Sequence, residues 1–213
     1  MNAPMVFIVD DDAAVRDSLV LLCESASLPV EAFDCAEPFL ASYGPERTGC
    51  LILDVRMPGM TGPQLHEELQ RRGCQLPVIY LTAHGDIPMT VRAIKAGAAD
   101  FLTKPVAGAL WVDRVQAALA SDQEIRQRAA DLAAKRARFA ALTEREREVM
   151  AFALAGECSK VTAKRLGISH RTVETYRSRI LLKTGARSAL ELGKLVADCG
   201  LSVKPVSRPR SGP

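Results

Sequence analysis

The sequence predicts a doubly wound α/β domain with a five-stranded parallel sheet, followed by a smaller all-helical domain. Three observations support this prediction. Short apolar runs alternate with helical patterns up to about residue 120. Beyond that point helix-capping signals follow one another. The charge also changes: residues 1–120 hold nine Lys and Arg against fifteen Asp and Glu, or −6, whereas residues 121–213 hold 19 against ten, or +9.

The first half contains five runs that fit buried strands. Residues 6–9 are continuously apolar, as expected of a parallel strand covered on both faces. The other four runs lie at residues 30–33, 50–53, 78–81 and 101–102. Helical spacing is found at residues 15–26, 36–42, 62–72, 87–96 and 109–119. Five strands alternating with five helices predict an open sheet with right-handed crossovers, within a domain of residues 1–120.

The second half is expected to be helical. Residues 121–141 lack Gly and Pro and predict a helical linker, with a short coiled coil as an open alternative. Within a domain of residues 142–202, capping boxes start at Thr143 and Ser188, and Ser169 caps a helix that runs to about residue 184. A short helix at residues 159–166 ends at Gly167. The proline-containing tail, residues 203–213, is predicted to be disordered.

Composition excludes several classes of protein. No apolar run approaches the roughly 20 residues that a membrane span needs, and no secretory signal starts the sequence. We therefore expect a cytoplasmic protein without a membrane partner. Six cysteines form no C-x-x-C pair, so reduced, buried thiols are favoured over a disulfide or zinc framework. The basic second half favours a polyanionic partner.

Reactive side chains follow four of the predicted strands. They are Asp10 and Asp11, Asp54, Thr82, and Lys104. Because the carboxyl ends of parallel strands meet at one edge, these residues are expected to form one site. Three neighbouring carboxylates repel unless a cation intervenes, and Mg²⁺ prefers oxygen ligands. Asp54 could then attack a phosphoryl group as a nucleophile, with Lys104 and Thr82 contacting phosphate oxygens.

Sequence motifs around these residues resemble the receiver domain of two-component response regulators. They are Val-Asp-Asp-Asp at 9–12, Leu-Asp-Val-Arg-Met-Pro-Gly-Met-Thr-Gly at 53–62, Leu-Thr-Ala-His-Gly-Asp at 81–86, Lys-Ala-Gly-Ala at 95–98 and Asp-Phe-Leu-Thr-Lys-Pro at 100–105. The resemblance implies a flavodoxin-like fold and phosphorylation of Asp54 by a sensor histidine kinase.

The same resemblance implies roles for the neighbouring residues. Mg²⁺ would be bound by Asp11, Asp54 and the carbonyl of Arg56, with Asp10 acting through water. Thr82 and Ala83 would hold the phosphate, and Phe101 would turn inward as a switch, although a static core aromatic is the plain alternative. The resemblance also implies a cis Lys104-Pro105 bond. Arg56 and His84 would flank the phosphate.

Residues 156–180 have the spacing of a helix-turn-helix: a short helix, a glycine turn and a longer helix. In the longer helix, Val173, Ile180 and either Tyr176 or Arg177 are expected to face inward. A polar, mostly basic face remains, made of His170, Arg171, Glu174, Thr175, Ser178 and Arg179. The N-terminus of this helix could also meet a phosphate.

This half resembles the LuxR-type output domain of the NarL/FixJ subfamily through Leu-Thr-Glu-Arg-Glu at 142–146, Ile-Ser-His-Arg-Thr-Val-Glu at 168–174 and Lys-Thr-Gly-Ala-Arg-Ser at 183–188. The resemblance implies base contacts by Glu174, Thr175 and Ser178. Phosphate contacts are expected from Lys160, Arg171, Thr172, Arg177, Arg179 and Lys183. Ser159, Thr162 and Tyr176 depart from the family pattern, where an Asn, an apolar residue and a His are common.

These observations favour a transcription regulator in which phosphorylation of Asp54 gates binding to double-stranded promoter DNA. Residues 87–103 would form the homodimer of the phosphorylated protein, and RNA polymerase is an expected partner. The last helix, residues 188–199, would mediate dimerisation on DNA or simply pack in the core. An aspartyl-phosphate enzyme is disfavoured, because Arg56 stands where a phosphatase of the haloacid dehalogenase type has its second Asp. A protein-interaction module is disfavoured by the positive charge.

Overall fold

The computed structural model describes residues 3–44, 46–83 and 87–202, without the side chains of residues 87–89 and 92. The predicted tail and His84 lie outside the described residues. The chain divides into two compact units, Met1–Arg126 and Gln127–Pro213.

The first unit contains the five-stranded parallel sheet that the sequence predicts. Its order is β2-β1-β3-β4-β5, and every neighbouring pair is parallel. The strands are β1 (Met5–Val9), β2 (Val30–Phe33), β3 (Gly49–Asp54), β4 (Val78–Thr82) and β5 (Asp100–Thr103). The shift in order between β1 and β3 marks the switch point at which open α/β sheets bind ligands.

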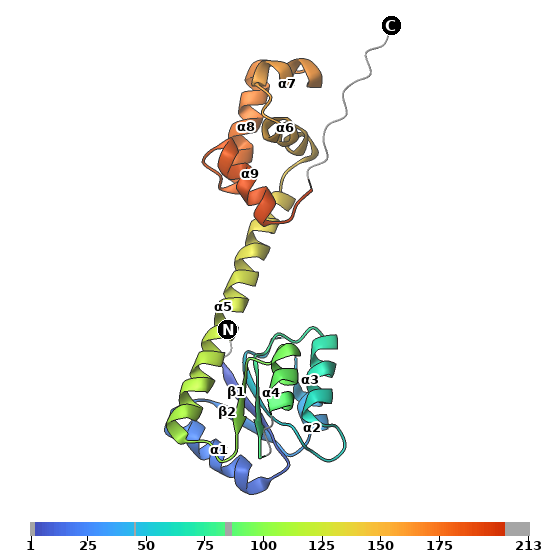
Figure 1. The fold of residues 1–213 in the computed structure, drawn as a ribbon. Coiled ribbons are helices and arrows are strands. Elements are labelled where there is room, and N and C mark those ends of the chain that lie inside the picture. Colours follow the sequence, from blue (N-terminus) through green and yellow to red (C-terminus); the bar gives the residue numbers. More distant parts are fainter. Residues whose placement is uncertain (1–2, 45, 84–86, 203–213) are drawn as a thin grey trace. The chain divides into compact units, whose positions relative to one another are not determined.

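Helices cover both faces of the sheet (Figure 1). On one face lie α1 (Ala13–Ser25) and the first part of α5 (Gly108–Ala140); on the other lie α2 (Ala36–Ser42), α3 (Gly62–Arg71) and α4 (Ile87–Lys95). In β1, Val6 and Ile8 pack against the first face, whereas Phe7 and Val9 pack against the second. This double burial explains why the strand is apolar at every position.

Helix α5 is one continuous helix from residue 108 to residue 140, where the sequence suggested a helix and a separate linker. No Gly or Pro interrupts it after Gly108. Phe139 is buried in the core of the second unit and Leu132 packs against that core. Arg136, which interrupts the apolar stripe, donates from Nε to the carbonyl oxygen of Cys199 at 3.1 Å. The end of α5 is therefore part of the helical core.

Within the first unit, α5 is attached to the start of β3 by a buried carboxylate. Asp122 is 1% exposed, and its Oδ2 accepts from the backbone N–H of Gly49 at 2.9 Å. Arg126 Nε donates to both oxygens of Asp122 at 2.9 Å, and its Nη2 donates to the carbonyl of Arg47 at 2.8 Å. We call these residues the Asp122 clasp. They hold α5 against the end of the sheet opposite Asp54.

We expect Asp122→Ala to lower the free energy of unfolding of the first unit by about 2–3 kcal/mol, because Gly49 loses its acceptor and Arg126 loses its counter-charge. Trp111, the single tryptophan, is fully buried in this unit, so its fluorescence reports the urea transition. Asp113→Ala, at an exposed position of the same helix, is the control and should change stability by less than about 0.5 kcal/mol. Equal effects of the two substitutions on the free energy of unfolding would contradict the stabilising role of the Asp122 clasp.

The second unit is helical, as predicted. After α5 come α6 (Glu144–Leu154), α7 (Ser159–Leu166), α8 (His170–Thr184) and α9 (Ala189–Asp198). The capping box at Thr143 is formed with Glu146 in both directions. The box predicted at Ser188 is half formed: Ser188 accepts from the N–H of Glu191, but the Glu191 carboxylate accepts from the N–H of Arg187.

Hydropathy and cysteine burial agree only in part with the expectations from composition. Among the described residues, no helix is both long and apolar enough to cross a membrane. All six cysteines are free thiols, as expected. Burial differs from the expectation, since Cys23, Cys50 and Cys199 are buried whereas Cys35 and Cys74 are half-buried and Cys158 is exposed.

Candidate functional site

Strand register places the reactive side chains at one edge of the sheet. Leu53 pairs with Val9, the residue before Asp10, and Asp54 pairs with Leu81, the residue before Thr82. The backbone N–H of Lys104 donates to the carbonyl of Thr82 at 2.8 Å, which brings the end of β5 to the same edge. The Lys104-Pro105 bond is cis, as the resemblance implies.

Lys104 bridges two carboxylates from different strands. Its Nζ lies 2.5 Å from Oδ2 of Asp10 and 2.7 Å from Oδ1 of Asp54. The other oxygen of Asp54, Oδ2, accepts from the backbone N–H of Arg56 at 2.6 Å. Asp10 and Asp54 are 1% and 5% exposed. A buried carboxylate pair is thus held around a single ammonium group.

Burial and charge oppose each other in this cluster. Burial disfavours the ammonium of Lys104, but its close contacts with the carboxylates of Asp10 and Asp54 outweigh burial and raise the pKa of Lys104. Burial raises the pKa of Asp10 above its ordinary value despite the pairing with Lys104. Because Lys104 stays charged, it can hold an anion that arrives at this edge.

The three aspartates at the end of β1 differ in their surroundings. Asp12, the last residue of the Val-Asp-Asp-Asp motif, accepts from the N–H groups of Ala14 and Val15 as the N-cap of α1. An Asp directly before a helical pattern is the signal that could have predicted this role. Asp11 is exposed. Asp10 accepts at Oδ1 from the N–H of Asp12 at 3.0 Å. The structure therefore brings Asp10 and Asp54 together through Lys104 and leaves Asp11 at the surface.

The donors at this edge suit a hard cation. Among the described residues, no three His, Cys, Asp or Glu side chains are already gathered as a metal site. Asp10 and Asp54 nevertheless provide only oxygen donors, and the buried Oδ2 of Asp10 has an ion-pair contact with Lys104 but no well-directed hydrogen bond. Carboxylate oxygens with lone pairs that no hydrogen bond uses are suitable ligands for Mg²⁺.

The expected switch residues lie next to this cluster. Thr82 is 2% exposed at the end of β4, and Ala83 follows it at the surface. Phe101 is half-buried and packs beside Tyr80 and Ala93 on the α3–α4 side of the sheet. His84, expected to flank the phosphate, lies outside the described residues, and Arg56 presents an exposed side chain.

In the second unit, helix α8 presents the polar face that the sequence predicts. Val173 and Ile180 are buried, and Tyr176 packs partly against the core. Ser169 caps the helix by accepting from the N–H of Thr172 at 3.0 Å. The exposed residues of the face are His170, Arg171, Glu174, Thr175, Ser178 and Arg179, and Lys160 is exposed on α7.

Two residues expected to contact phosphates are used inside the domain. Arg177 is half-buried, and its Nη2 donates to the carbonyl of Glu157 at 2.5 Å. Lys183 Nζ forms an ion pair with Oε2 of Glu146 at 2.7 Å, and Glu146 is 2% exposed. The spacing along α8 could not show this, because both partners come from other helices. Lys183 remains exposed although it is paired, so phosphate binding by Arg177 and Lys183 stays a prediction.

Lys183 and Lys160 should therefore differ when substituted. We expect Lys183→Met to lower the free energy of unfolding of the second unit by about 1–2 kcal/mol, because Glu146 loses its cation. Lys160→Met should leave stability unchanged but reduce the slope of log K against log salt for DNA binding by about one. Hydrogen exchange of α6 and α8 peptides and salt-dependent binding measure the two effects. The reverse pattern would restore Lys183 to the DNA surface.

Glu146 should also make the second unit sensitive to acid. The hydrogen bond from Lys183 holds the pKa of Glu146 below its ordinary value of 4.5. The unfolded chain therefore binds this proton more readily, so the stabilisation is present above about pH 4.5 and is lost as pH falls through the folded-state pKa. We expect α6 and α8 to lose hydrogen-exchange protection more steeply on acidification in wild type than in Glu146→Gln. Parallel loss in both proteins would contradict this.

The departures from the family pattern in α7 are accommodated locally. Thr162 is fully buried, and its hydroxyl donates to the carbonyl of Cys158 at 3.3 Å, the back-bond that lets a Thr sit in a helix. Ser159 is buried at the start of α7. The helix still ends at Gly167, whose φ of 65° suits glycine. The scaffold helix is formed despite these substitutions.

A carboxylate–lysine cluster at the switch point of a parallel sheet, joined to a helix-turn-helix, defines a class of signal-responsive DNA-binding regulators. Family comparison agrees. Residues 6–116 match the response regulator receiver domain, and residues 140–196 match the luxR family of bacterial regulatory proteins. The chain belongs to the response regulator family, with a receiver domain and a LuxR-type DNA-binding domain.

Relatives align over nearly the whole chain. The transcriptional regulatory protein TdiR of Thauera aromatica is 42% identical over 215 residues, which cover 98% of this chain and 95% of that protein. FixJ of Azorhizobium caulinodans is 41% identical over 197 residues, which cover 92% of this chain and 93% of that protein. The low-resolution structure of the response regulator StyR is 43% identical, with a TM-score of 0.84 over 92% of this chain and 99% of that chain.

These findings confirm the predicted fold and class. The pairing of the two domains indicates a histidine kinase and DNA as partners, and receiver domains generally bind Mg²⁺. The matched relatives are transcriptional regulators, so the aspartyl-phosphate enzyme is not supported.

Proposed function

We propose that a histidine kinase phosphorylates Asp54 and that this modification controls sequence-specific DNA binding by helix α8. The observation that carries the proposal is the pair of contacts made by Lys104 with Asp10 and Asp54 at the switch point of the sheet. A buried nucleophilic carboxylate beside a fixed ammonium group is suited to accept and retain a phosphoryl group.

In the transfer, an oxygen of Asp54 attacks the phosphorus of a phosphohistidine. The new O–P bond forms as the N–P bond breaks, and the histidine nitrogen keeps the electron pair. Asp54 is oriented by the N–H of Arg56 and by Lys104. Lys104 stays charged and can pair with an oxygen of the transferred group, while Thr82 and Ala83 at the end of β4 offer hydrogen bonds to the others.

Asp10, Asp11, Asp54 and the carbonyl of Arg56 are the residues that would hold Mg²⁺. When bound, the cation supplies positive charge that offsets the repulsion between these carboxylates and the incoming phosphoryl group. Lys104 already offsets part of that repulsion for two of the carboxylates.

Phosphorylation would act on the output by favouring a homodimer through α4 and β5. Val91 and Ile94 of α4 are 45% and 47% exposed, which leaves an apolar strip available for such contacts. On DNA, Glu174, Thr175 and Ser178 would read bases, and Arg171, Arg179, Lys160 and Thr172 would contact phosphates. Exposed Leu190 on α9 supports a role for that helix in pairing on DNA, and RNA polymerase would be the downstream partner.

Capture of sheared genomic DNA by the purified protein tests the proposal. The protein is used with and without Mg²⁺ and a small phosphodonor, and Asp54→Asn serves as the control. Enrichment of a few pseudo-palindromic sites only with the donor supports gating. Enrichment without the donor would indicate a constitutive DNA binder, and no enrichment would favour a protein-interaction module.

A further inference from the structure

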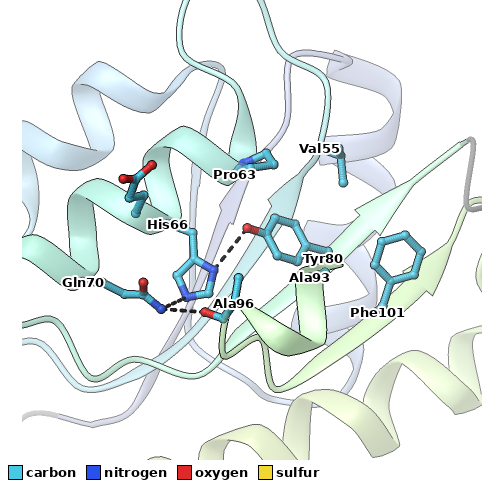
Figure 2. A pocket seen from close by; sticks show the side chains of 9 residues that line it. Val55, Pro63, His66, Gln70, Tyr80, Ala93, Ala96 and Phe101 are labelled. Atoms are coloured by element: carbon cyan, nitrogen blue, oxygen red, sulfur yellow. Dashed lines mark hydrogen bonds between the residues drawn. The ribbon is translucent and has the colours of Figure 1, made fainter. Parts of the chain in front are cut away.

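A cavity of about 460 Å³ lies in the first unit between α3, α4 and the sheet (Figure 2). Its volume is within the 300–1,000 Å³ range of small-molecule sites. The apolar lining comes from Val55, Pro63, Ala93, Ala96 and Phe101, and the polar lining from His66, Glu67, Gln70 and Tyr80. The small side chains of Ala93 on α4 and of Ala96 just after that helix line this space together with Phe101.

The polar lining forms a chain of hydrogen bonds whose directions can be deduced. Gln70 Nε2 donates to the carbonyl of Ala96 at 2.7 Å. A carbonyl can only accept, so the amide nitrogen must face it, and the orientation of Gln70 is fixed. The same nitrogen lies 3.2 Å from His66 Nε2 and directs its second N–H there. His66 therefore accepts at Nε2.

The tautomer of His66 then determines the state of Tyr80. Burial lowers the pKa of His66, so the ring is neutral near pH 7 and carries its single N–H on Nδ1. Nδ1 lies 3.1 Å from the Tyr80 hydroxyl oxygen and donates to it (Figure 2). The hydroxyl hydrogen of Tyr80 finds no acceptor in this chain of bonds. Since Tyr80 is 2% exposed, this unused donor is buried at the cavity.

The lining also determines the charge of a suitable ligand. A neutral His66 offers no positive charge, and the acidic residue Glu67 is part of the lining, so an anion is disfavoured. A cation is disfavoured by the apolar wall around Phe101. An acceptor placed against Tyr80 would satisfy the hydroxyl hydrogen that the bonds among Gln70, His66 and Tyr80 leave unused.

We propose that this cavity binds a small, uncharged, mostly apolar molecule that carries one hydrogen-bond acceptor for the Tyr80 hydroxyl. Such a molecule would contact Phe101 and α4 together. Provided that the proposed function holds, these contacts would couple ligand binding to phosphorylation, since a ligand that prefers one state shifts the population towards it.

Binding can be tested on the full-length protein by ¹⁹F NMR. The probe is 4-fluoroacetophenone, and 1-ethyl-4-fluorobenzene, which lacks the acceptor, is the matched control probe. For ligands of this size we expect saturable binding with a Kd on the order of 0.1–1 mM. Tyr80→Phe keeps the ring and should weaken the ketone about fivefold with little effect on the hydrocarbon.

Filling the cavity with Ala93→Leu should abolish binding of both probes, and Ala96→Leu is the second variant in case the first does not fold, as judged by Trp111 fluorescence. The absence of saturation up to ~5 mM probe, or saturable binding that survives these substitutions, would overturn the proposal. Asp54→Asn should bind as wild type does, because this site does not use Asp54. If the affinity for the ketone is the same with and without Mg²⁺ and a phosphodonor, the coupling to phosphorylation is rejected. The Tyr80 and Ala93 variants test separately whether the cavity is the binding site.

Discussion

Replacing Asp54 with asparagine should abolish phosphate uptake from a small acyl phosphate and reduce it by more than about 100-fold with a histidine kinase. The amide has nearly the same shape as the carboxylate but is a poor nucleophile. Arg56 and Lys104 donate to different oxygens of Asp54, so the single amide oxygen of asparagine keeps one of these two hydrogen bonds, and the fold should persist. A phosphate-affinity gel measures uptake, and light scattering measures whether the donor converts wild type, but not the variant, into a dimer.

Asp34→Asn provides the matched control for Asp54. Asp34 directly follows β2 and is exposed, so it is also an aspartate at a strand end but lies outside the contacts of Lys104. Its replacement should leave phosphate uptake within about twofold of wild type. If Asp54→Asn still took up phosphate at the wild-type level, the acceptor would have to be another residue, and the proposed role of Lys104 would fail with it.

Those parts of the fold that depend on local patterns could be predicted from the sequence. Strand β1 is covered on both faces, so its burial is visible as an uninterrupted apolar run. Asp54 and Lys104 were predicted to meet because parallel strands bring their carboxyl ends to one edge, and they meet at 2.7 Å. The parallel topology was thus sufficient to predict a contact between two residues that lie 50 positions apart in the sequence.

Contacts that depend on tertiary partners could not be predicted in this way. Asp122 looked like one of several charges on a linker helix, and only the fold shows that it accepts from Gly49. Lys183 and Arg177 are basic residues of the kind found on a DNA-binding face. In the structure, Lys183 forms an ion pair with Glu146, and Arg177 donates to the carbonyl of Glu157. The capping box predicted the bond between Glu146 and the N–H of Thr143, but the burial of Glu146, which explains its pairing with Lys183, is visible only in the fold.

Effects on both stability and phosphate uptake are expected from Gly62→Ala, a substitution that leaves every reactive side chain in place. Gly62 begins α3, and its N–H donates to the carbonyl of Val55 at 3.2 Å. A Cβ at this position would lie 2.2 Å from the carbonyl oxygen of Asp54 and 3.1 Å from Cγ of Leu53. Because the clash is with the backbone of β3, either the start of α3 or Asp54 itself has to move.

We expect Gly62→Ala to lower the free energy of unfolding by about 2–3 kcal/mol and to slow phosphate uptake at least ~10-fold, since small displacements of a nucleophile are costly. Urea unfolding followed by Trp111 and the rate of uptake from an acyl phosphate measure these effects. Gly59→Ala, in the loop that leads to α3, is the control. The φ of 73° at this position costs an alanine about 1 kcal/mol, but its Cβ would meet nothing closer than Oε1 of Glu37 at 3.5 Å. Uptake by the Gly59 variant should therefore stay within about threefold of wild type, because no backbone atom of Asp54 is pushed. Equal slowing in both variants would mean that loop strain, and not the contact between Gly62 and Asp54, controls the position of the nucleophile.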